Sequence, residues 1–300
     1  NVVINSLMTI IRDTSLSSHH QTAVAITLRI VRILGFQSDP LLDNVINAFT
    51  YRFYHSDTGG ALQETLLDHL ITMIYIVRRD IARHLITIIK LTCDCFNTHL
   101  ILCLNMVEAL CFILLPHDFN GVLREVLPCM VQVNRDELLQ DRDELISLKN
   151  DSNLSSSNTS LSSNTHTSSS TSSSSFTDSS SNSTSSTNFT TSKKITSLPK
   201  SSRIFTTIAN ISPALGEYRR QLIPVILKVV EENSVRSETR REALCAVMQL
   251  AIDSSDLNEF ASRIIHPLLR LLSGNDTLLQ TAALTSLSCM VCRLKSSLRW

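Results

Sequence analysis

The feature that most constrains this chain is a pair of amphipathic helical patterns, joined by a short polar turn, between residues 257 and 294. In the first pattern apolar residues recur every three or four positions, at Phe260, Ile264, Ile265, Leu268 and Leu272. The second carries its apolar face on Leu279, Ala282, Ala283, Leu287, Met290 and Val291. Gly274 and Asn275 end the first helix, and the second restarts at Asp276. Two such helices pack antiparallel and cannot bury both of their faces alone, so they need further pairs beside them.

The same arrangement recurs along the chain. Leu7–Ile11 (LMTII) is echoed 78 residues later by Leu85–Ile89 (LITII), which corresponds to two periods of 39. Pro128, Pro224 and Pro267 each fall inside the first helix of a pair, and the last two are 43 residues apart. We expect each proline to remove one hydrogen bond and to bend its helix at the same place in successive repeats. A helix pair every 39 to 43 residues is the HEAT or armadillo period, and two helices per unit favour HEAT.

The sequence therefore predicts an all-α protein, a HEAT-repeat α-solenoid of antiparallel helix pairs. Ser17 is the expected N-cap of one helix, and Gly35 is expected to end it. The other expected helices precede the two described above. In chain order they are a helix ending at about Asp13, helices at 18–34, 40–53, 61–77, 80–93 and 99–115, a helix from Asp118 or Asn120 to about Val133, a helix starting at about Arg203, and helices at 217–231 and 237–252.

A segment rich in Ser and Thr interrupts this pattern, and it divides the chain into HEAT repeats at 1–135, an insertion at 136–202 and HEAT repeats at 203–300. The insertion carries too few apolar residues to offset its ordering entropy, so we expect a disordered loop within one repeat. One alternative is that Asp136–Lys149 extends as a charged helix. The insertion is interpreted either as a phosphorylation-tuned tether or as neutral low-complexity sequence, and the absence of a clear acceptor context favours the latter.

Eight cysteines raise the question of a metal or redox site; they are Cys93, Cys95, Cys103, Cys111, Cys129, Cys245, Cys289 and Cys292. The i, i+4, i+8 spacing of Cys95, His99 and Cys103 predicts that they share one helix face, where they could present metal ligands. No fourth ligand has matching spacing, so packing in a core is favoured. Cys289–Cys292 is a CxxC, but it is expected late in a helix, whereas a redox motif needs the helix start to lower the thiol pKa.

Nothing else in the sequence indicates catalysis. No GxGxxG, P-loop or HExxH motif occurs, so we assign no catalytic, cofactor-binding or metal residue. His19 and His20 are interpreted as exposed polar surface, and Asp68–His69 as a helical pair without a catalytic constellation. The arginine pairs at 78–79 and 240–241 either contact partners or form ion pairs with nearby acids such as Glu231 or Glu232.

Composition excludes further classes of protein. Twenty-seven basic residues balance 27 acidic ones, which gives no indication of nucleic-acid binding. No apolar run is long enough for a transmembrane segment; Leu100–Pro116 comes nearest, but it is short and contains Glu108. We expect the chain to be an internal part of a longer protein, without a secretory signal peptide of its own.

Three stretches resemble the HEAT region of the target of rapamycin kinases: Ser6–His20 (SLMTIIRDTSLSSHH), Ala261–Arg270 (ASRIIHPLLR) and Glu217–Pro224 (EYRRQLIP). The resemblance covers residues 1–133 and 203–294. It implies a noncatalytic scaffold segment of a serine/threonine kinase that controls growth in response to nutrients. It further implies two protein partners, a second copy of the chain and a substrate-presenting adaptor subunit. ATP and magnesium would belong to the kinase domain of the parent protein, which would be cytoplasmic or at endomembrane or lysosomal surfaces.

Two other functions remain open. The chain could be a HEAT adaptor unrelated to kinases, such as a phosphatase scaffold or a transport receptor. An independent enzyme is a weaker alternative, since the catalytic constellations that it would need are missing. A kinase domain downstream in the gene would discriminate the first function from these.

Overall fold

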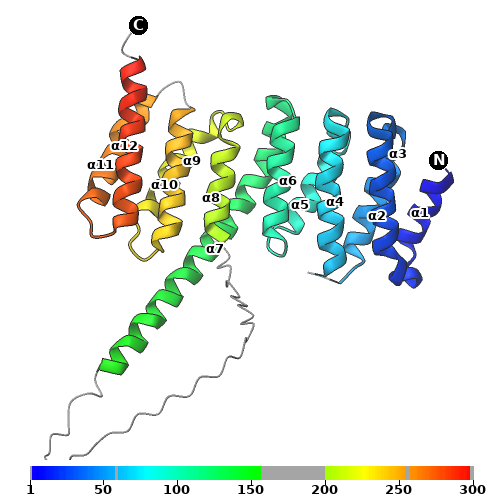
Figure 1. Cartoon of the computed structure of the whole chain (residues 1–300), viewed down its shortest axis with the longest axis horizontal. Coiled ribbons are helices and arrows are strands. Elements are labelled where there is room, and N and C mark those ends of the chain that lie inside the picture. The colour runs from blue at the N-terminus through cyan, green and yellow to red at the C-terminus, as the bar shows by residue number, and fades with distance from the viewer. Residues whose placement is uncertain (1, 58–59, 157–199, 254–256, 298–300) are drawn as a thin grey trace, which may run out of the picture. The chain divides into compact units, whose positions relative to one another are not determined.

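The computed structural model describes residues 2–57, 60–156, 200–253 and 257–297 (Figure 1). Within these ranges every regular element is an α-helix or a short 3-10 turn, and no strand is present. The predicted all-α fold class is therefore confirmed. Helices are also what the composition favours, because Leu, Ile, Val and Ala dominate over turn-forming and aromatic residues.

The chain divides into two units, residues 1–143 together with 199–300, and residues 144–198. The larger unit is built of antiparallel helix pairs. The first helices of the pairs are α1 (Val2–Arg12), α3 (Asp39–Tyr54), α5 (Leu85–Asp94), α7 (Pro116–Ser156), α9 (Tyr218–Glu231) and α11 (Leu257–Leu272). Their second helices are α2 (Ser17–Leu34), α4 (Ala61–Val77), α6 (Leu100–Ile113), α8 (Lys200–Asn210), α10 (Ser237–Ile252) and α12 (Thr277–Ser297). The described part of the smaller unit is the C-terminal end of α7.

The pairs of the larger unit stack side by side, in the order of the sequence (Figure 1). Each second helix contacts the second helix of the next pair, from α2 through α4, α6, α8 and α10 to α12. Among the first helices, α1 contacts α3 and α9 contacts α11. Four fully buried phenylalanines, Phe49, Phe96, Phe119 and Phe205, belong to the continuous core between the two layers. This arrangement is the predicted solenoid, in which each repeat buries its apolar faces against its neighbours.

The three helix-interior prolines lie in the helices where the sequence predicted them. Pro128 lies inside α7, Pro224 inside α9 and Pro267 inside α11, each in the first helix of its pair. Proline has no backbone N–H, so one carbonyl of the preceding turn lacks its usual hydrogen bond. Each of these three helices nevertheless continues past its proline.

The helix ends are partly as expected. Gly35 follows α2 with a φ of +53°, a conformation that strongly favours glycine. Asp276 caps α12, because its Oδ1 accepts hydrogen bonds from the backbone N–H groups of Leu278 (2.9 Å) and Leu279 (3.2 Å). The prediction that Ser17 is an N-cap was wrong: α2 already includes it, and a 3-10 turn capped by Asp13 precedes the helix.

Other predicted boundaries shift. The expected helix 80–93 is a 3-10 turn over Arg78–His84 followed by α5. The helix expected to end near Val133 continues as α7 to Ser156, which includes the alternative charged helix at 136–149. The predicted border at residue 135 therefore falls inside a helix, and α8 begins at Lys200, before the predicted 203. Residues 157–199 lie outside the described ranges, so the disordered insertion stays a prediction.

Candidate interaction surfaces

The three residues proposed as one helical ligand face do not share a helix. Cys95 is the C-cap of α5, His99 directly precedes α6, and Cys103 lies within α6. The prediction of a shared helix face was wrong, because the turn between α5 and α6 interrupts the assumed i, i+4, i+8 spacing. The Sγ atoms of Cys95 and Cys103 nevertheless lie 3.3 Å apart in the core, whereas His99 Nε2 lies 3.1 Å from Gln63 Oε1.

Cys103 is held as the protonated thiol. The hydrogen bond with Cys95, followed by burial, raises the pKa of Cys103 far above its usual range. Both sulfurs also lie 3.6 Å from the backbone oxygen of Thr92, which can accept the S–H that the contact between the two thiols does not use. The pair therefore acts as core packing that joins the end of α5 to α6.

The remaining cysteines divide by exposure. Cys93 of α5 and Cys129 of α7 both donate to the carbonyl oxygen of Glu125, and burial raises the pKa of Cys93 to about 12. Cys245, Cys289 and Cys292 are exposed. The CxxC of Cys289 and Cys292 lies late in α12, as predicted.

His20 and His69 each contact their own fold. His20 is only 1% exposed and its Nε2 lies 2.8 Å from the backbone oxygen of Asp13, so its assignment to exposed surface was wrong. His69 lies beside Asp68 on α4, with 4.0 Å between Nδ1 and Oδ2, and burial lowers the pKa of its ring. In the part of the chain that the structure describes, no three His, Cys, Asp or Glu side chains gather in a way that could hold a metal ion.

The arginine pair at 240–241 contacts its own fold, and the charge of Glu232 acts on Arg240 as predicted. Arg240 Nε donates to the backbone oxygen of Val230 at 2.9 Å, and Arg241 pairs with Glu242. The partner of Glu231 is instead Arg270, 39 residues further along, at 2.5 Å between Nη2 and Oε1. This ion pair joins the last turns of α9 and α11, the first helices of successive repeats.

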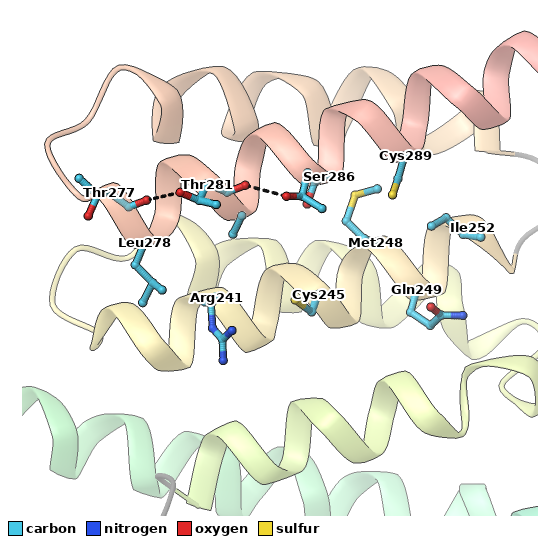
Figure 2. Close-up of a pocket in the computed structure, with 12 residues that line it drawn as sticks. Arg241, Cys245, Met248, Gln249, Ile252, Thr277, Leu278, Thr281, Ser286 and Cys289 are labelled. Carbon is cyan, nitrogen blue, oxygen red and sulfur yellow. Dashed lines mark hydrogen bonds between the residues drawn. The ribbon is translucent and has the colours of Figure 1, made fainter.

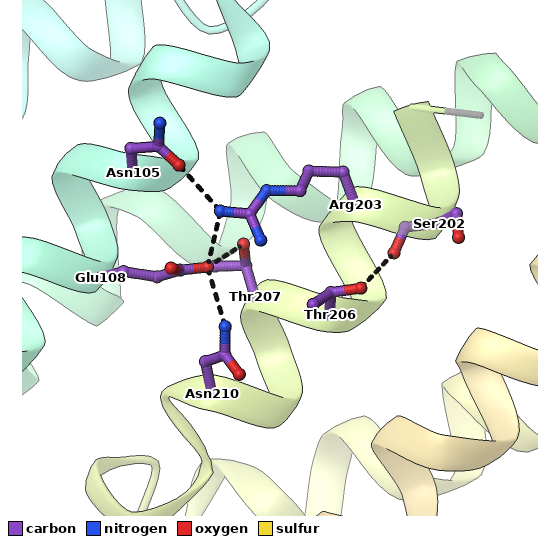
Figure 3. A network of polar contacts seen from close by, with 7 residues as sticks. All are labelled: Asn105, Glu108, Ser202, Arg203, Thr206, Thr207 and Asn210. Atoms are coloured by element: carbon purple, nitrogen blue, oxygen red, sulfur yellow. Dashed lines mark hydrogen bonds and ion pairs between the residues drawn. The ribbon is translucent and has the colours of Figure 1, made fainter. Parts of the chain in front are cut away.

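A polar network connects α6 with α8 across the insertion (Figure 3). Oε1 of Glu108 accepts from Thr207 Oγ1 (2.6 Å) and Asn210 Nδ2 (3.3 Å), and lies 3.1 Å from Arg203 Nη2. The same Nη2 donates to Asn105 Oδ1 at 2.7 Å. The sequence offered one signal for this network, a single carboxylate in the otherwise apolar stretch of α6. Its partners could not be found, because they lie about a hundred residues away.

Shallow grooves lie between neighbouring helices of one layer. One of about 630 Å³ lies between α10 and α12 and is lined by Cys245, Met248, Leu278 and Cys289, among others (Figure 2). Another, of about 540 Å³, lies between α5 and α7. Several apolar side chains also point into solvent, including Ile33 at 85% exposure, Ile86 at 84% and Phe112 at 82%. Hydrophobic grooves are one kind of surface in which an amphipathic helix can bind.

No helix in the described ranges is both long enough and apolar enough to cross a membrane. This agrees with the absence of a long apolar run in the sequence.

Comparison with known proteins gives a consistent set of relatives. Residues 1–78 match the family described as serine/threonine-protein kinase mTOR domain. Serine/threonine-protein kinase tor1 of Schizosaccharomyces pombe is 24% identical over 98% of this chain and 10% of its own length. Serine/threonine-protein kinase mTor of Drosophila melanogaster is 23% identical over 95% of the chain and 9% of its length. Serine/threonine-protein kinase TOR of Oryza sativa is 30% identical over 44% of this chain and 6% of its own length. The chain spans at most a tenth of the length of these relatives.

Proposed function

We propose that this chain, which is a segment of the helical-repeat region of the target of rapamycin family, serves as a noncatalytic scaffold in a serine/threonine kinase that controls growth in response to nutrients. The observation that carries the proposal is the stacking of its helix pairs. Among the described helices the main contacts run between neighbours in the stack, which leaves outward faces of both layers available. A rigid series of such faces can present several partners in a fixed arrangement.

The expected partners are a second copy of the chain and an adaptor subunit that presents substrates. The family resemblance suggests both, and the grooves and exposed apolar side chains supply surfaces of the right character. ATP and magnesium are assigned to a kinase domain elsewhere in the parent protein. A location in the cytoplasm, at endomembrane or lysosomal surfaces, belongs to the same proposal.

The alternative is a HEAT scaffold in a complex without a kinase, such as a phosphatase scaffold or transport receptor. All of the relatives reported above are named kinases, which favours the first function. The remainder of the gene decides between the two, because only the first requires a kinase domain downstream.

The test is a replacement of this segment, in the full-length protein, by an equal length of HEAT repeats from an unrelated protein. We expect kinase activity toward a generic peptide to survive, while dimerisation and adaptor-dependent phosphorylation are lost. A swapped protein that dimerises and phosphorylates adaptor-recruited substrates normally would reduce the segment to a spacer. Loss of generic activity in a well-folded swap would instead indicate a catalytic contribution.

A further inference from the structure

We propose that the groove between α5 and α7 binds an amphipathic helix of a partner protein, one that carries an apolar face bordered by Lys or Arg. The proposal rests on the scaffold function above and assigns one of its binding sites. Three features of the groove carry it: its exposed apolar rim, a glycine in its wall and the sign of its charges.

The groove has an apolar interior that is open to solvent. Leu85, Ile86 and Ile89 of α5 line one side, and Val122 of α7 lines the other. Ile86 is 84% exposed, although isoleucine is among the residues most often buried in folded proteins. Two neighbouring helices with a groove between them form the surface into which a third helix packs its ridge of side chains.

The wall of the groove contains Gly121, at a helical position where the fold itself does not require glycine. Gly121 lies in the second turn of α7, its φ is not positive, and a Cβ built on it would meet no atom within 4 Å. Glycine inside a helix destabilises it relative to alanine. Neither backbone conformation nor internal packing accounts for this residue. A ligand that approaches the backbone of α7 closely would account for it.

Charged side chains around the groove determine the chemistry of the partner. Asp94, Asp118 and Glu125 line it, against one basic residue, Lys90. The Tyr54 hydroxyl donates to Asp94 Oδ2 at 2.6 Å, which orients that carboxylate at the edge of α5. A segment with Lys or Arg beside its apolar face would meet an excess of carboxylates here, and an acidic segment would be repelled.

The groove between α10 and α12 does not support an equally specific proposal. It is lined mainly by Thr, Cys, Met and aliphatic side chains, and Arg241, its one charged residue, pairs with Glu242. Those features do not favour one partner chemistry over another.

The test measures binding of two synthetic peptides to the full-length protein by fluorescence anisotropy. Both peptides are helical, of about four turns, with Leu at the i, i+3, i+4, i+7 positions; one carries Lys and Arg beside this face and the other carries Glu. We expect the basic peptide to bind and the acidic one to bind at least about tenfold more weakly. Glu125→Lys should reduce or reverse that preference.

Substitutions at the rim and in the wall locate the site. Ile86→Ser should weaken binding of the basic peptide about tenfold, as loss of a central apolar contact does. Ile33→Ser, at an equally exposed isoleucine on α2, is the matched control and should leave binding unchanged. Gly121→Ala should raise Tm yet weaken binding, and Gly121→Leu should abolish it.

Three outcomes would overturn the proposal: equal binding of both peptides, unchanged binding by Gly121→Leu, or binding that appears only after residues 157–199 are deleted. The last would assign the groove to a segment of the chain itself. Because the readout is peptide binding, failure here leaves dimerisation and adaptor-dependent phosphorylation to be judged by the segment swap.

Discussion

At the scale of single residues, two helix ends have the same backbone conformation but different side chains. Gly35 after α2 has φ +53° and ψ −124°, and Arg78 after α4 has φ +58° and ψ −125°. Each donates its backbone N–H to a carbonyl in the last turn of its helix, Val31 and Ile74, respectively. The conformation is open to glycine and strained for any residue with a Cβ. The repeat therefore stores strain at Arg78 that it avoids at Gly35.

This comparison predicts that Arg78→Gly raises the free energy of unfolding by about 1–2 kcal/mol, because the strain is relieved. Arg78→Ala is the control, since it removes the side chain but keeps the Cβ, and it should not stabilise. Gly35→Ala should act in the opposite direction by a similar amount. Chemical denaturation of the four proteins measures all of these changes. Equal stability of Arg78→Gly and Arg78→Ala would show that the backbone at this position is not strained.

A second residue-scale prediction concerns pH. Burial lowers the pKa of both His69 and His84 below the usual 6.5. Above about pH 6.5 their imidazoles are neutral in the folded and unfolded chain, so the shift has no effect. As the pH falls below 6.5, the unfolded chain binds protons first, and the free energy of unfolding decreases until the folded-state pKa values are reached. The double variant His69→Gln/His84→Gln should lose less stability than wild type between pH 7 and pH 5.5. Parallel curves for the two proteins would contradict this.

At the scale of helices, α8 is connected to its neighbours by interactions of unequal strength. The network of Glu108, Arg203, Thr207 and Asn210 is partly buried between α6 and α8. Glu108 accepts hydrogen bonds from Thr207 and Asn210 and forms an ion pair with Arg203. The ion pair of Lys200 with Glu137 of α7 is more exposed on the lysine side. Desolvation strengthens the first set of contacts, whereas solvent screens the second.

We therefore expect a double-mutant cycle of Glu108→Ala and Arg203→Ala to give a coupling energy of about 1–3 kcal/mol in urea unfolding. The same cycle on Lys200→Ala and Glu137→Ala should give less than about 0.5 kcal/mol. Similar values for the two cycles would mean that the network does not hold α8 against α6 more firmly than a surface ion pair does.

At the scale of the whole molecule, the structure corrects the limits of the dispensable segment. The Ser- and Thr-rich part of the predicted insertion, residues 151–202, carries few apolar residues, so from the sequence alone its deletion is expected to leave stability unchanged. However, α8 begins at Lys200, and Ser201 and Ser202 are buried at 1% and 0% exposure. A deletion through residue 202 would remove the first turn of α8 together with the residue that pairs with Glu137.

Replacing residues 157–199 by a flexible Gly/Ser linker should leave Tm and helical circular dichroism nearly unchanged, because loop-closure free energy varies by only about 0.6 kcal/mol per doubling of length. Extending the replacement to residue 202 should lower Tm clearly. If the shorter replacement already lowers Tm by many degrees, residues 157–199 contribute to packing.

The sequence alone determined the class of the fold and the period of its repeats. Apolar spacing, the three helix-interior prolines, Gly35 and Asp276 are local signals, and each acts within a few residues of its own position. These signals predicted the helix pairs, the order of the helices, and most helix boundaries to within a few residues. The start of α5 was missed because a 3-10 turn takes the place of its expected first residues, and the extension of α7 was predicted only as the alternative helix at 136–149.

Only the tertiary structure decided which side chains meet. A turn placed His99 against Gln63 rather than beside the two neighbouring thiols, and Glu108 found its partners about a hundred residues away. The groove between α5 and α7 likewise depends on two helices whose separation no local pattern encodes. The periodicity of a sequence specifies which face of a helix is buried. Which helix covers that face, and what remains open beside it, follows only from the packing of the whole chain.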